Sequence, residues 1–318
     1  MTTARDDLDN RLAQLKREVP TRGFERHPSV LKNISDLPTE LQSPTVITLA
    51  SSKALQTIIT FPPQIHRGSH YVPKQALLFT PKDVIHLLAS IWPDQEPQIT
   101  YLKGCGLMYM KVTLVLLYGF LEIVAQGHDS PTLLSVEFNT VAWDRLSSPL
   151  RQLLQATISM PSAPTEKNTY TPAMQQAIEK LPLKFLNGVK IYGLLPGEEL
   201  EELVFQPGDW KRWLLLVRRP NTSNTLLLLT SNYMVVIQED PVVGQGWIIS
   251  YLPRNSIVGM QNQPRRLYNE LTIQLKREDQ TAEYKLSLKS EITQAWRERW
   301  VQHNGIWQDI PEEAEKYP

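Results

Sequence analysis

Short apolar runs separated by turn residues fill most of this chain. In its second half the segments RRPNTSN, SNY and REDQTA have turn composition, and the residues on both sides of REDQTA alternate between apolar and polar. This alternation predicts a hairpin of two half-buried strands. In the second half we predict strands at residues 213–217, 225–230, 234–238, 247–252, 271–276 and 283–289.

The first half has the same pattern. We predict strands there at residues 54–61, 75–80, 83–90, 98–102, 120–125 and 133–139. Its longest apolar run, residues 112–121, lies between Lys111 and Glu122 and is too short to cross a hydrocarbon core of about 30 Å as a helix. We therefore expect a strand pair or one buried strand in this run.

The two halves repeat each other at a spacing of 150 residues. Average residue usage predicts roughly three identities over residues 77–123, and the gapless alignment contains many more. The identical pairs are Leu77/Leu227, Leu78/Leu228, Thr80/Thr230, Ile99/Ile249, Tyr101/Tyr251, Leu102/Leu252, Met110/Met260, Leu117/Leu267, Tyr118/Tyr268, Leu121/Leu271 and Ile123/Ile273. We interpret this as a tandem duplication; the alternative is coincidence between leucine-rich strands.

Each half ends in a segment of helical periodicity. Near the C-terminus one helical face carries Ile292, Ala295, Trp296 and Trp300. We predict Ser290 as the N-cap of this helix. In the first half we expect Pro149 to break the helix and Ser148 to cap a second segment. That segment buries Leu150, Leu153 and Leu154.

The order of about seven strands followed by a tryptophan-bearing helix resembles the pleckstrin-homology-like (PH-like) fold of small bacterial domains. The segments that carry the resemblance are LLPGEELEELVFQPGDWKRW, LLLLTSNYMVVIQED and ITQAWRERW. It covers residues 195–303 well and residues 37–157 less well. The resemblance implies a mainly β (α+β) chain with two PH-like barrels or sandwiches. Each is closed by a C-terminal α-helix, and an N-terminal helix precedes them.

These features divide the chain into five segments. We predict an N-terminal helix and connector at 1–36, a first PH-like domain at 37–157, a linker with a short helix at 158–194, a second PH-like domain at 195–305 and an acidic tail at 306–318. The N-terminal helix carries an apolar stripe of Leu8, Leu12, Leu15 and Val19. We expect this helix to dock on its own domain; self-association and fraying are the alternatives.

Composition limits the partners and the location. The 33 Lys and Arg residues balance 33 Asp and Glu residues, so a broad basic surface for nucleic acid is not expected. The charged N-terminus has no apolar stretch of the kind found in secretory signals. The single cysteine, Cys105, permits no intrachain disulfide, which fits a cytoplasmic location.

Candidate catalytic chemistry is sparse. Cys105 has no neighbouring histidine or cation in the sequence to lower its pKa, so we expect a small buried cysteine rather than a nucleophile. His66 and His70 lie in a loop-like segment without a third ligand, so we expect no metal site. His86 is expected to be a packed or edge histidine. Phosphate-loop, nucleophile-elbow and zinc motifs are absent from the sequence. We expect neither an enzyme nor a cofactor.

The resembled fold is most often associated with phosphoinositide recognition by basic residues near the loop between its first two strands. The candidates here are Arg212, Arg218, Arg219, His66, Arg67 and Lys74. Neither half reproduces the spaced Lys-Arg-x-Arg signature of that family. In the loops that would share this end, Asp94, Glu96, Glu239 and Asp240 would offset the positive field.

Taken together, the duplication, the neutral charge and the missing catalytic motifs predict a non-catalytic interaction module. Its two PH-like domains would bind a protein partner or associate with a second copy of the chain. One alternative is peripheral membrane association through Arg212, Arg218 and Arg219. The other is an enzyme with a cleft between the domains.

Overall fold

The computed structural model describes residues 4–19, 27–66, 70–158, 170–213, 217–241, 245–303 and 305–310, and leaves out the side chains of residues 66 and 210–221. The structure is mainly β, with several antiparallel sheets and some helices. It divides into two compact units. Unit 1 comprises Met1–Cys105, Leu117–Phe120 and Leu134–Thr157, and unit 2 comprises Gly106–Leu116, Leu121–Leu133 and Ile158–Pro318.

Unit 1 contains a five-stranded antiparallel sheet with the order β1-β2-β5-β6-β7. The strands are β1 (Ser29–Leu31), β2 (Thr57–Phe61), β5 (Gln75–Phe79), β6 (Asp83–Leu88) and β7 (Gln98–Lys103). A hairpin of β3 (Gln64–His66) and β4 (His70–Val72) is inserted between β2 and β5. Strands β2, β5, β6 and β7 confirm the sequence prediction, whereas β1, β3 and β4 were not predicted.

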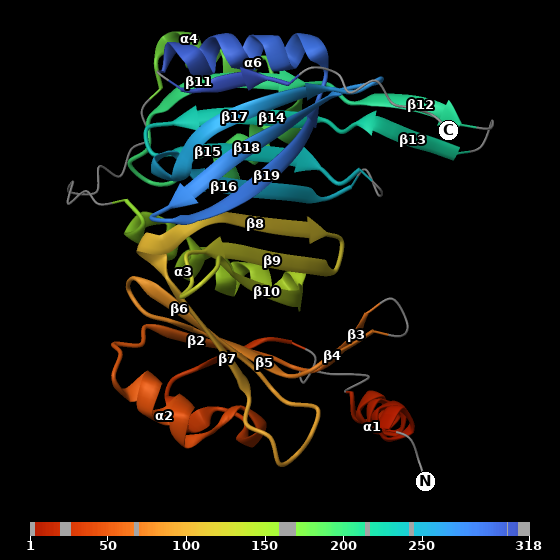
Figure 1. Ribbon diagram of the computed structural model, residues 1–318, viewed down its shortest axis with the longest axis vertical. Coiled ribbons are helices and arrows are strands. Elements are labelled where there is room, and N and C mark those ends of the chain that lie inside the picture. Colours follow the sequence, from red (N-terminus) through yellow and green to blue (C-terminus); the bar gives the residue numbers. More distant parts are fainter. Residues whose placement is uncertain are drawn as a thin grey trace. The chain divides into compact units, whose positions relative to one another are not determined.

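The α-helices of unit 1 are α1 (Ala4–Glu18), α2 (Pro44–Ser51) and α3 (Trp143–Ala156). Helix α2 begins after Ser43, whose side chain accepts a hydrogen bond from the Val46 N–H, and it lies against the sheet (Figure 1). Val46 and Ala50 of α2 are buried in one apolar cluster with sheet residues such as Ile58 and Leu78.

Helix α3 runs through Pro149 without a break, so the predicted break and the Ser148 cap are wrong. Proline removes one intrahelical hydrogen bond, and that cost is offset here by burial on both sides of it. Leu146 precedes the proline and is fully buried. The three leucines predicted to be buried after the proline are buried: Leu150, Leu153 and Leu154.

A polar pair lies inside the sheet of unit 1. Gln75 on β5 and His86 on β6 are 2% and 6% exposed, and the His86 Nε2 lies 3.0 Å from the Gln75 Oε1. Burial lowers the pKa of His86 to about 4, because the imidazolium form loses its hydration there. The prediction of a packed histidine at this position is confirmed.

The main sheet of unit 2 runs in the order β9-β8-β16-β15-β14-β11, and a second sheet has the order β19-β18-β17-β20. The strands of the first are β8 (Leu107–Val115), β9 (Tyr118–Ala125), β11 (Leu200–Gln206), β14 (Thr225–Thr230), β15 (Tyr233–Glu239) and β16 (Trp247–Pro253). Those of the second are β17 (Ile257–Pro264), β18 (Asn269–Arg277), β19 (Gln280–Leu288) and β20 (Trp307–Asp309). Between β9 and α3 the chain forms β10 (Thr132–Asn139). Most of these strands confirm predicted ones, and β8 with β9 forms the strand pair expected within residues 112–121.

Strands β11 and β17 were not predicted, and two further parts of unit 2 differ from the sequence prediction. Instead of a strand at residues 213–217 and a turn after it, β12 (Asp209–Trp213) and β13 (Val217–Thr222) form a hairpin that extends from the sheet (Figure 1). Residues 214–216 lie outside the described residues. The predicted acidic tail begins with β20, which pairs in parallel with β17. This segment is held by backbone hydrogen bonds to a strand that is distant in the sequence, and composition does not reveal such pairing.

Strand β8 pairs with β16, although the two are far apart in the sequence. The pairing is antiparallel and runs from Trp247↔Leu114 to Tyr251↔Met110. Gly246 allows the approach: its φ is +108°, and a Cβ there would lie 2.5 Å from the Leu114 carbonyl oxygen. The segment of residues 195–305 predicted as a domain therefore lacks two strands, β8 and part of β9, that belong to unit 2.

Corresponding elements recur at the spacing of the sequence identities. Strands β14, β15 and β17 start 150 residues after β5, β6 and β8, and the turn at Arg254–Ser256 follows that at Gly104–Gly106 at the same spacing. The orders β2-β5-β6-β7 and β11-β14-β15-β16 also correspond, with a hairpin inserted after the first strand of each. Most of the residues that are identical in the two halves therefore lie at matching positions of matching strands.

Helix α6 (Ser290–Gln302) closes the core of unit 2 (Figure 1). Trp296 is fully buried and Trp300 is 6% exposed, in a cluster that also contains Met108 of β8 and Val124 of β9. The N-cap residue is Lys289 rather than Ser290, so that prediction is wrong. The Ser290 hydroxyl instead donates to the Asn269 Oδ1 at 3.2 Å, which ties the helix start to β18.

The opposite face of the main sheet of unit 2 is covered by the segment before β11. It contains α4 (Pro172–Glu179), which confirms the predicted helix, α5 (Leu183–Gly188) and a π-helical turn, η6 (Val189–Gly193). Phe185 of α5 is 1% exposed, and its ring centroid lies 4.9 Å from that of Phe205 and 5.4 Å from that of Trp247. The linker predicted before α4 is largely outside the described residues.

Among the described residues, no helix is both long and apolar enough to cross a membrane.

Replacing Trp296 with alanine should destabilise the protein by about 3–5 kcal/mol, because a fully buried indole leaves a large cavity. Its indole N–H has no hydrogen-bond partner among the described residues, so the loss is one of packing. Trp143→Ala serves as the comparison. The sequence alone predicts that Trp143, on the helix that ends the first half, is equivalent to Trp296. Trp143 is only half-buried, so this expectation is wrong and its replacement should cost clearly less. Chemical denaturation measures both, and equal losses would contradict the packing assignment.

The pKa of His86 makes stability depend on pH. Because the folded-state pKa of about 4 lies below the ordinary value of 6.5, the unfolded chain binds the proton more readily between these values. The stabilisation by neutral His86 is complete above pH 6.5 and is lost as the pH falls to 4. The loss in the free energy of unfolding is about 3 kcal/mol, at 1.36 kcal/mol per pKa unit. Urea denaturation between pH 7 and 4 should show a shallower loss for His86→Gln. Parallel curves for the two proteins would argue against this assignment.

Candidate functional site

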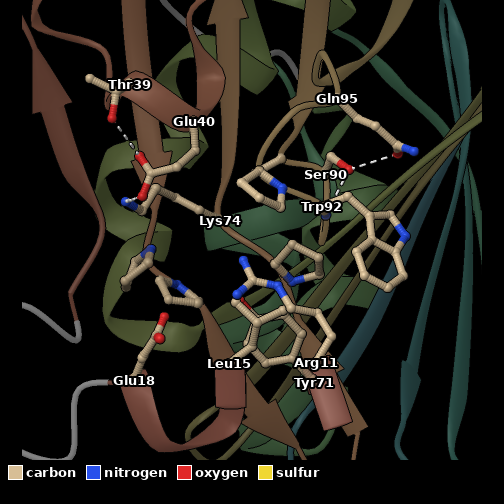
Figure 2. Close-up of a pocket in the computed structure, with 15 residues that line it drawn as sticks. Arg11, Leu15, Glu18, Thr39, Glu40, Tyr71, Lys74, Ser90, Trp92 and Gln95 are labelled. Carbon is tan, nitrogen blue, oxygen red and sulfur yellow. Dashed lines mark hydrogen bonds and ion pairs between the residues drawn. The ribbon is translucent and has the colours of Figure 1, made fainter. Parts of the chain in front are cut away.

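A cleft of about 570 Å³ lies within unit 1. Its walls come from α1, the turn at Thr39–Leu41, the connections on both sides of the β3–β4 hairpin, and the loop between β6 and β7 (Figure 2). Six lining residues are prolines or large aromatics: Pro62, Pro63, Tyr71, Pro73, Trp92 and Pro93. The cleft therefore offers rigid apolar surfaces at low cost in conformational entropy.

Helix α1 forms one wall of the cleft. The Arg11 Nε donates a hydrogen bond of 2.8 Å to the Ile91 carbonyl oxygen, and Leu15 lines the cleft from the same helix. Leu12 and Leu15 are half-buried and Val19 is buried, so these three residues of the apolar stripe face the body of unit 1, whereas Leu8 is exposed. The prediction that this helix docks on its own domain is confirmed.

The charges that line the cleft are matched. The Lys74 Nζ lies 2.7 Å from the Glu40 Oε1. Figure 2 draws this ion pair as a dashed line, and Arg11 lines the cleft together with Glu18. Partial burial raises the pKa of Glu40, but the hydrogen bond and the positive charge of Lys74 outweigh it and lower that pKa overall. The cleft thus holds two cations and two carboxylates, with no excess of either sign.

Tyr71 and Trp92 are half-buried and keep their polar tips available. None of the described residues hydrogen-bonds to the Tyr71 hydroxyl or to the Trp92 indole N–H. Burial and the nearby charge of Glu18 raise the pKa of Tyr71, so its hydroxyl remains a neutral donor. The Ser90 hydroxyl accepts a hydrogen bond of 3.0 Å from the Trp92 backbone N–H and donates to Gln95, which fixes the loop that carries the indole.

The predicted anion-binding residues are distributed over both units. In unit 1, Lys74 is in the cleft and is neutralised by Glu40, His66 is on β3, and Arg67 lies outside the described residues. In unit 2 the hairpin register pairs Arg212 with Arg218, and Lys211 with Arg219. The side chains of these arginines lie outside the described residues.

Two of the acidic residues expected to oppose them, Glu239 and Glu96, have other partners. The Glu239 carboxylate forms an ion pair with the Lys184 Nζ at 2.7 Å and accepts a hydrogen bond from the Asn224 side chain. That lysine also lies 4.7 Å from the centroid of the Trp247 ring. Glu96 accepts a weak hydrogen bond of 3.4 Å from Thr45.

Cys105 is exposed, so the prediction of a buried cysteine is wrong. It lies in a 3-10 turn between two buried glycines, Gly104 and Gly106. The Gly104 N–H donates to the Lys82 carbonyl at 2.8 Å, and a Cβ at this glycine would clash with that oxygen. His66 and His70 face each other across the β3–β4 hairpin rather than in a loop. Within the described part of the chain, no group of three or more metal-binding side chains occurs.

A smaller concavity of about 440 Å³ in unit 2 contains a tyrosine pair. The Tyr109 hydroxyl donates to Glu122 at 2.7 Å, and the buried Tyr284 hydroxyl donates to Ser250 at 2.7 Å. Burial raises the pKa of both tyrosines, that of Tyr284 to about 12. Both hydroxyls therefore stay protonated near neutral pH and do not serve as bases.

Of the residues that form the cleft, sequence reasoning singled out only Leu15 and Lys74. Arg11, Tyr71 and Trp92 come from a helix, a hairpin and a loop that are separate in the sequence. The only signals were local: the tripeptides FPP and YVP, and WPD in the β6–β7 loop. Prolines beside aromatic residues indicated rigid connections but not that these connections meet.

Comparison with known proteins adds little. No protein-family model matches the chain, and no curated protein matches it. Among solved structures, the hSac2 domain from human phosphoinositide phosphatase Sac2 is similar over 46% of this chain and 95% of that domain, at 15% identity and a TM-score of 0.29. A similarity at this TM-score supports no argument about fold or function.

Replacing Arg11 with alanine should loosen α1, because a half-buried, charge-assisted hydrogen bond contributes about 1.5–3 kcal/mol. Amide hydrogen exchange of residues 4–19 should accelerate by about tenfold or more. Arg17→Ala is the matched control: Arg17 is exposed on the same helix and has no hydrogen bond or ion pair to the described residues. Unchanged exchange in the Arg11 variant would show that the helix is held by its apolar stripe alone.

Proposed function

We propose that this chain is a non-catalytic interaction module, built from two PH-like domains in tandem, whose cleft in unit 1 binds an extended segment of a protein partner. The tandem arrangement is supported by the matching strand orders and by the spacing of 150 residues between matching elements. A cytoplasmic location and a bacterial origin are part of the same proposal and rest on sequence features alone.

The observation that carries the proposal is the lining of the cleft. Extended, proline-containing segments dock on grooves formed by aromatic rings, because their backbone has no internal hydrogen bonds and their rings pack flat. Tyr71 and Trp92 supply such faces, and their hydroxyl and indole N–H are donors for the carbonyl groups of the bound segment. The prolines of the walls keep this surface in place before binding, which reduces the entropic cost.

The same cleft is a poor match for a phosphorylated headgroup. A multiply charged anion requires several cations that converge on it without competing carboxylates. Lys74 is paired with Glu40, and the Arg11 guanidinium is engaged by the Ile91 carbonyl and by Gln14. An anion entering the cleft would first have to displace the Glu40 carboxylate from Lys74.

A second candidate function is peripheral membrane association through the β12–β13 hairpin. The register that pairs Arg212 with Arg218, with Arg219 next to it, concentrates three arginines on two short strands. Each basic residue near an anionic surface contributes about 1 kcal/mol. The net charge of zero offers no additional attraction from the rest of the chain.

The test starts with a photo-cross-linking residue in place of Gln95, which is exposed at the rim of the cleft. Cross-linking in extract of the native cell, followed by mass spectrometry, identifies the captured segment, and a synthetic peptide of that segment is used for titration. The variant Tyr71→Ala/Trp92→Ala should weaken peptide binding by at least about tenfold, or about 1.4 kcal/mol. Tyr268→Ala, which removes a half-buried tyrosine from unit 2, should leave affinity unchanged.

Two results would reject the cleft as the binding site. One is equal affinity of the captured peptide for the wild-type chain and the cleft variant. The other is co-flotation with anionic liposomes at about 0.15 M salt, where surface fields decay within about 8 Å, that is lost when Arg212, Arg218 and Arg219 are replaced by alanine. The second result would support the membrane function instead.

A further inference from the structure

The pairing of β8 with β16 shows which strands of this chain fit together at their edges. Antiparallel strands exchange hydrogen bonds at every second residue. The Glu239 N–H donates to the Asn224 carbonyl, so the peptide groups of Ile249 and Tyr251 point away from β15 and toward β8. Their partners on β8 are Val112 and Met110.

Strand β7 of unit 1 corresponds to β16 at the spacing of 150 residues, and Ile99 and Tyr101 are identical to Ile249 and Tyr251. The Thr80 N–H donates to the Asp83 carbonyl and the Ala89 N–H to the Lys74 carbonyl. These two bonds show which residues of β6 bond to β5, and the residues between them bond to β7. The peptide groups of Ile99 and Tyr101 therefore point away from β6. Among the described residues nothing pairs with that edge, because β7 is the last strand of its sheet.

Strand β17 of unit 2 corresponds in the same way to β8, and Met260 is identical to Met110. Its outer edge is occupied by β20 in parallel pairing. The Met260 N–H donates to the Ile306 carbonyl at 3.0 Å, and the Ile310 N–H donates to the Asn262 carbonyl at 2.8 Å. Met260 and Asn262 are the residues that match Met110 and Val112, so β20 covers the positions that β8 uses to pair with β16.

We propose that the free edge of β7 is a docking site for β17 of a second copy of this chain, and that β20 covers β17 until it is displaced. The register follows from the β8–β16 pairing: Met260 lies opposite Tyr101, Gln261 opposite Thr100, and Asn262 opposite Ile99. We assign β17 of a second copy as the occupant because its outward-pairing residues, Met260 and Asn262, stand at the positions of Met110 and Val112 in β8. This self-association surface is separate from the cleft and goes beyond the function proposed for it.

The edges of β7 and β17 are both protected against unspecific strand pairing between chains. An exposed edge strand is a template for aggregation unless it is short, charged or covered. β7 is short and ends in the exposed residues Gln98 and Lys103, and β17 is covered by a strand of three residues. The cover is small: it consists of the pairs Met260↔Trp307, Gln261↔Gln308 and Asn262↔Asp309.

The experiment uses the full chain and releases β20 by one substitution. In the parallel pairing of β20 with β17, the backbone N–H of Gln308 points toward β17. Gln308→Pro removes this donor and places the proline ring between the two strands. Sedimentation velocity over a concentration series measures association. Gln308→Pro should lower the apparent dissociation constant for self-association at least about tenfold relative to the wild-type chain.

Ile99→Pro blocks the other edge. Ile99 faces Leu87 in a pair without mutual hydrogen bonds, so proline removes only the outward N–H of β7. The double variant Gln308→Pro/Ile99→Pro should return to the association of the wild-type chain. Lys103→Pro at the end of the same edge is a second blocking variant, in case Ile99→Pro lowers stability. Thermal unfolding of each variant confirms that it is folded.

A disulfide test checks the register. In a Cys105→Ser, Gln308→Pro background, Thr100→Cys and Gln261→Cys should form a disulfide between two chains under mild oxidation. The mismatched pair Thr100→Cys and Val258→Cys should form it much more slowly, because Val258 lies three residues away from the predicted partner. Three results would overturn the proposal: a folded Gln308→Pro variant that stays monomeric, association that both β7-blocking variants leave intact, or equal cross-linking of matched and mismatched pairs.

Discussion

The pairing of β8 with β16 is the interaction on which unit 2 depends. It joins a strand of the first half of the sequence to the last strand of the β11-β14-β15-β16 order, and it brings Met108 and Val124 into the core that Trp296 closes. Gly246 is required for it, because any side chain there would meet the backbone of β8. The boundary between compact units therefore differs from the boundary between sequence repeats.

The cleft of unit 1 follows from a different constraint, which is that connections between strands must run over the surface. The β3–β4 hairpin, the β6–β7 loop and α1 converge on one region, and their prolines and aromatic side chains are only half-covered there. Lys74 and Glu40 neutralise each other at its rim. This balance of charge, beside the aromatic and proline side chains, is the basis for proposing an extended protein segment rather than a phosphate group as the ligand.

Sequence patterns located most strands of both halves, because period-two alternation and turn residues are local properties. They failed where a local rule was outweighed by contacts distant in sequence. Pro149 stays within α3 since Leu146 and Leu150 on both sides of it are buried. The segment expected to be a tail contains β20 because β17 offers it an edge. For the cleft, the sequence pointed to Leu15 and Lys74, whereas the aromatic residues beside them were missed.

The sequence by itself determined the mainly β class, the repeat spacing of 150 residues, the helical face around Trp296 and the overall charge balance. These depend on residue order, periodicity and composition. Only the tertiary structure decided which strand edges are paired, which cations are neutralised and which side chains meet in a cleft. The physical reason is that a strand edge displays the same backbone groups whatever its side chains are. Segments far away along the chain decide whether such an edge is covered, as in β16 and β17, or unpaired among the described residues, as in β7.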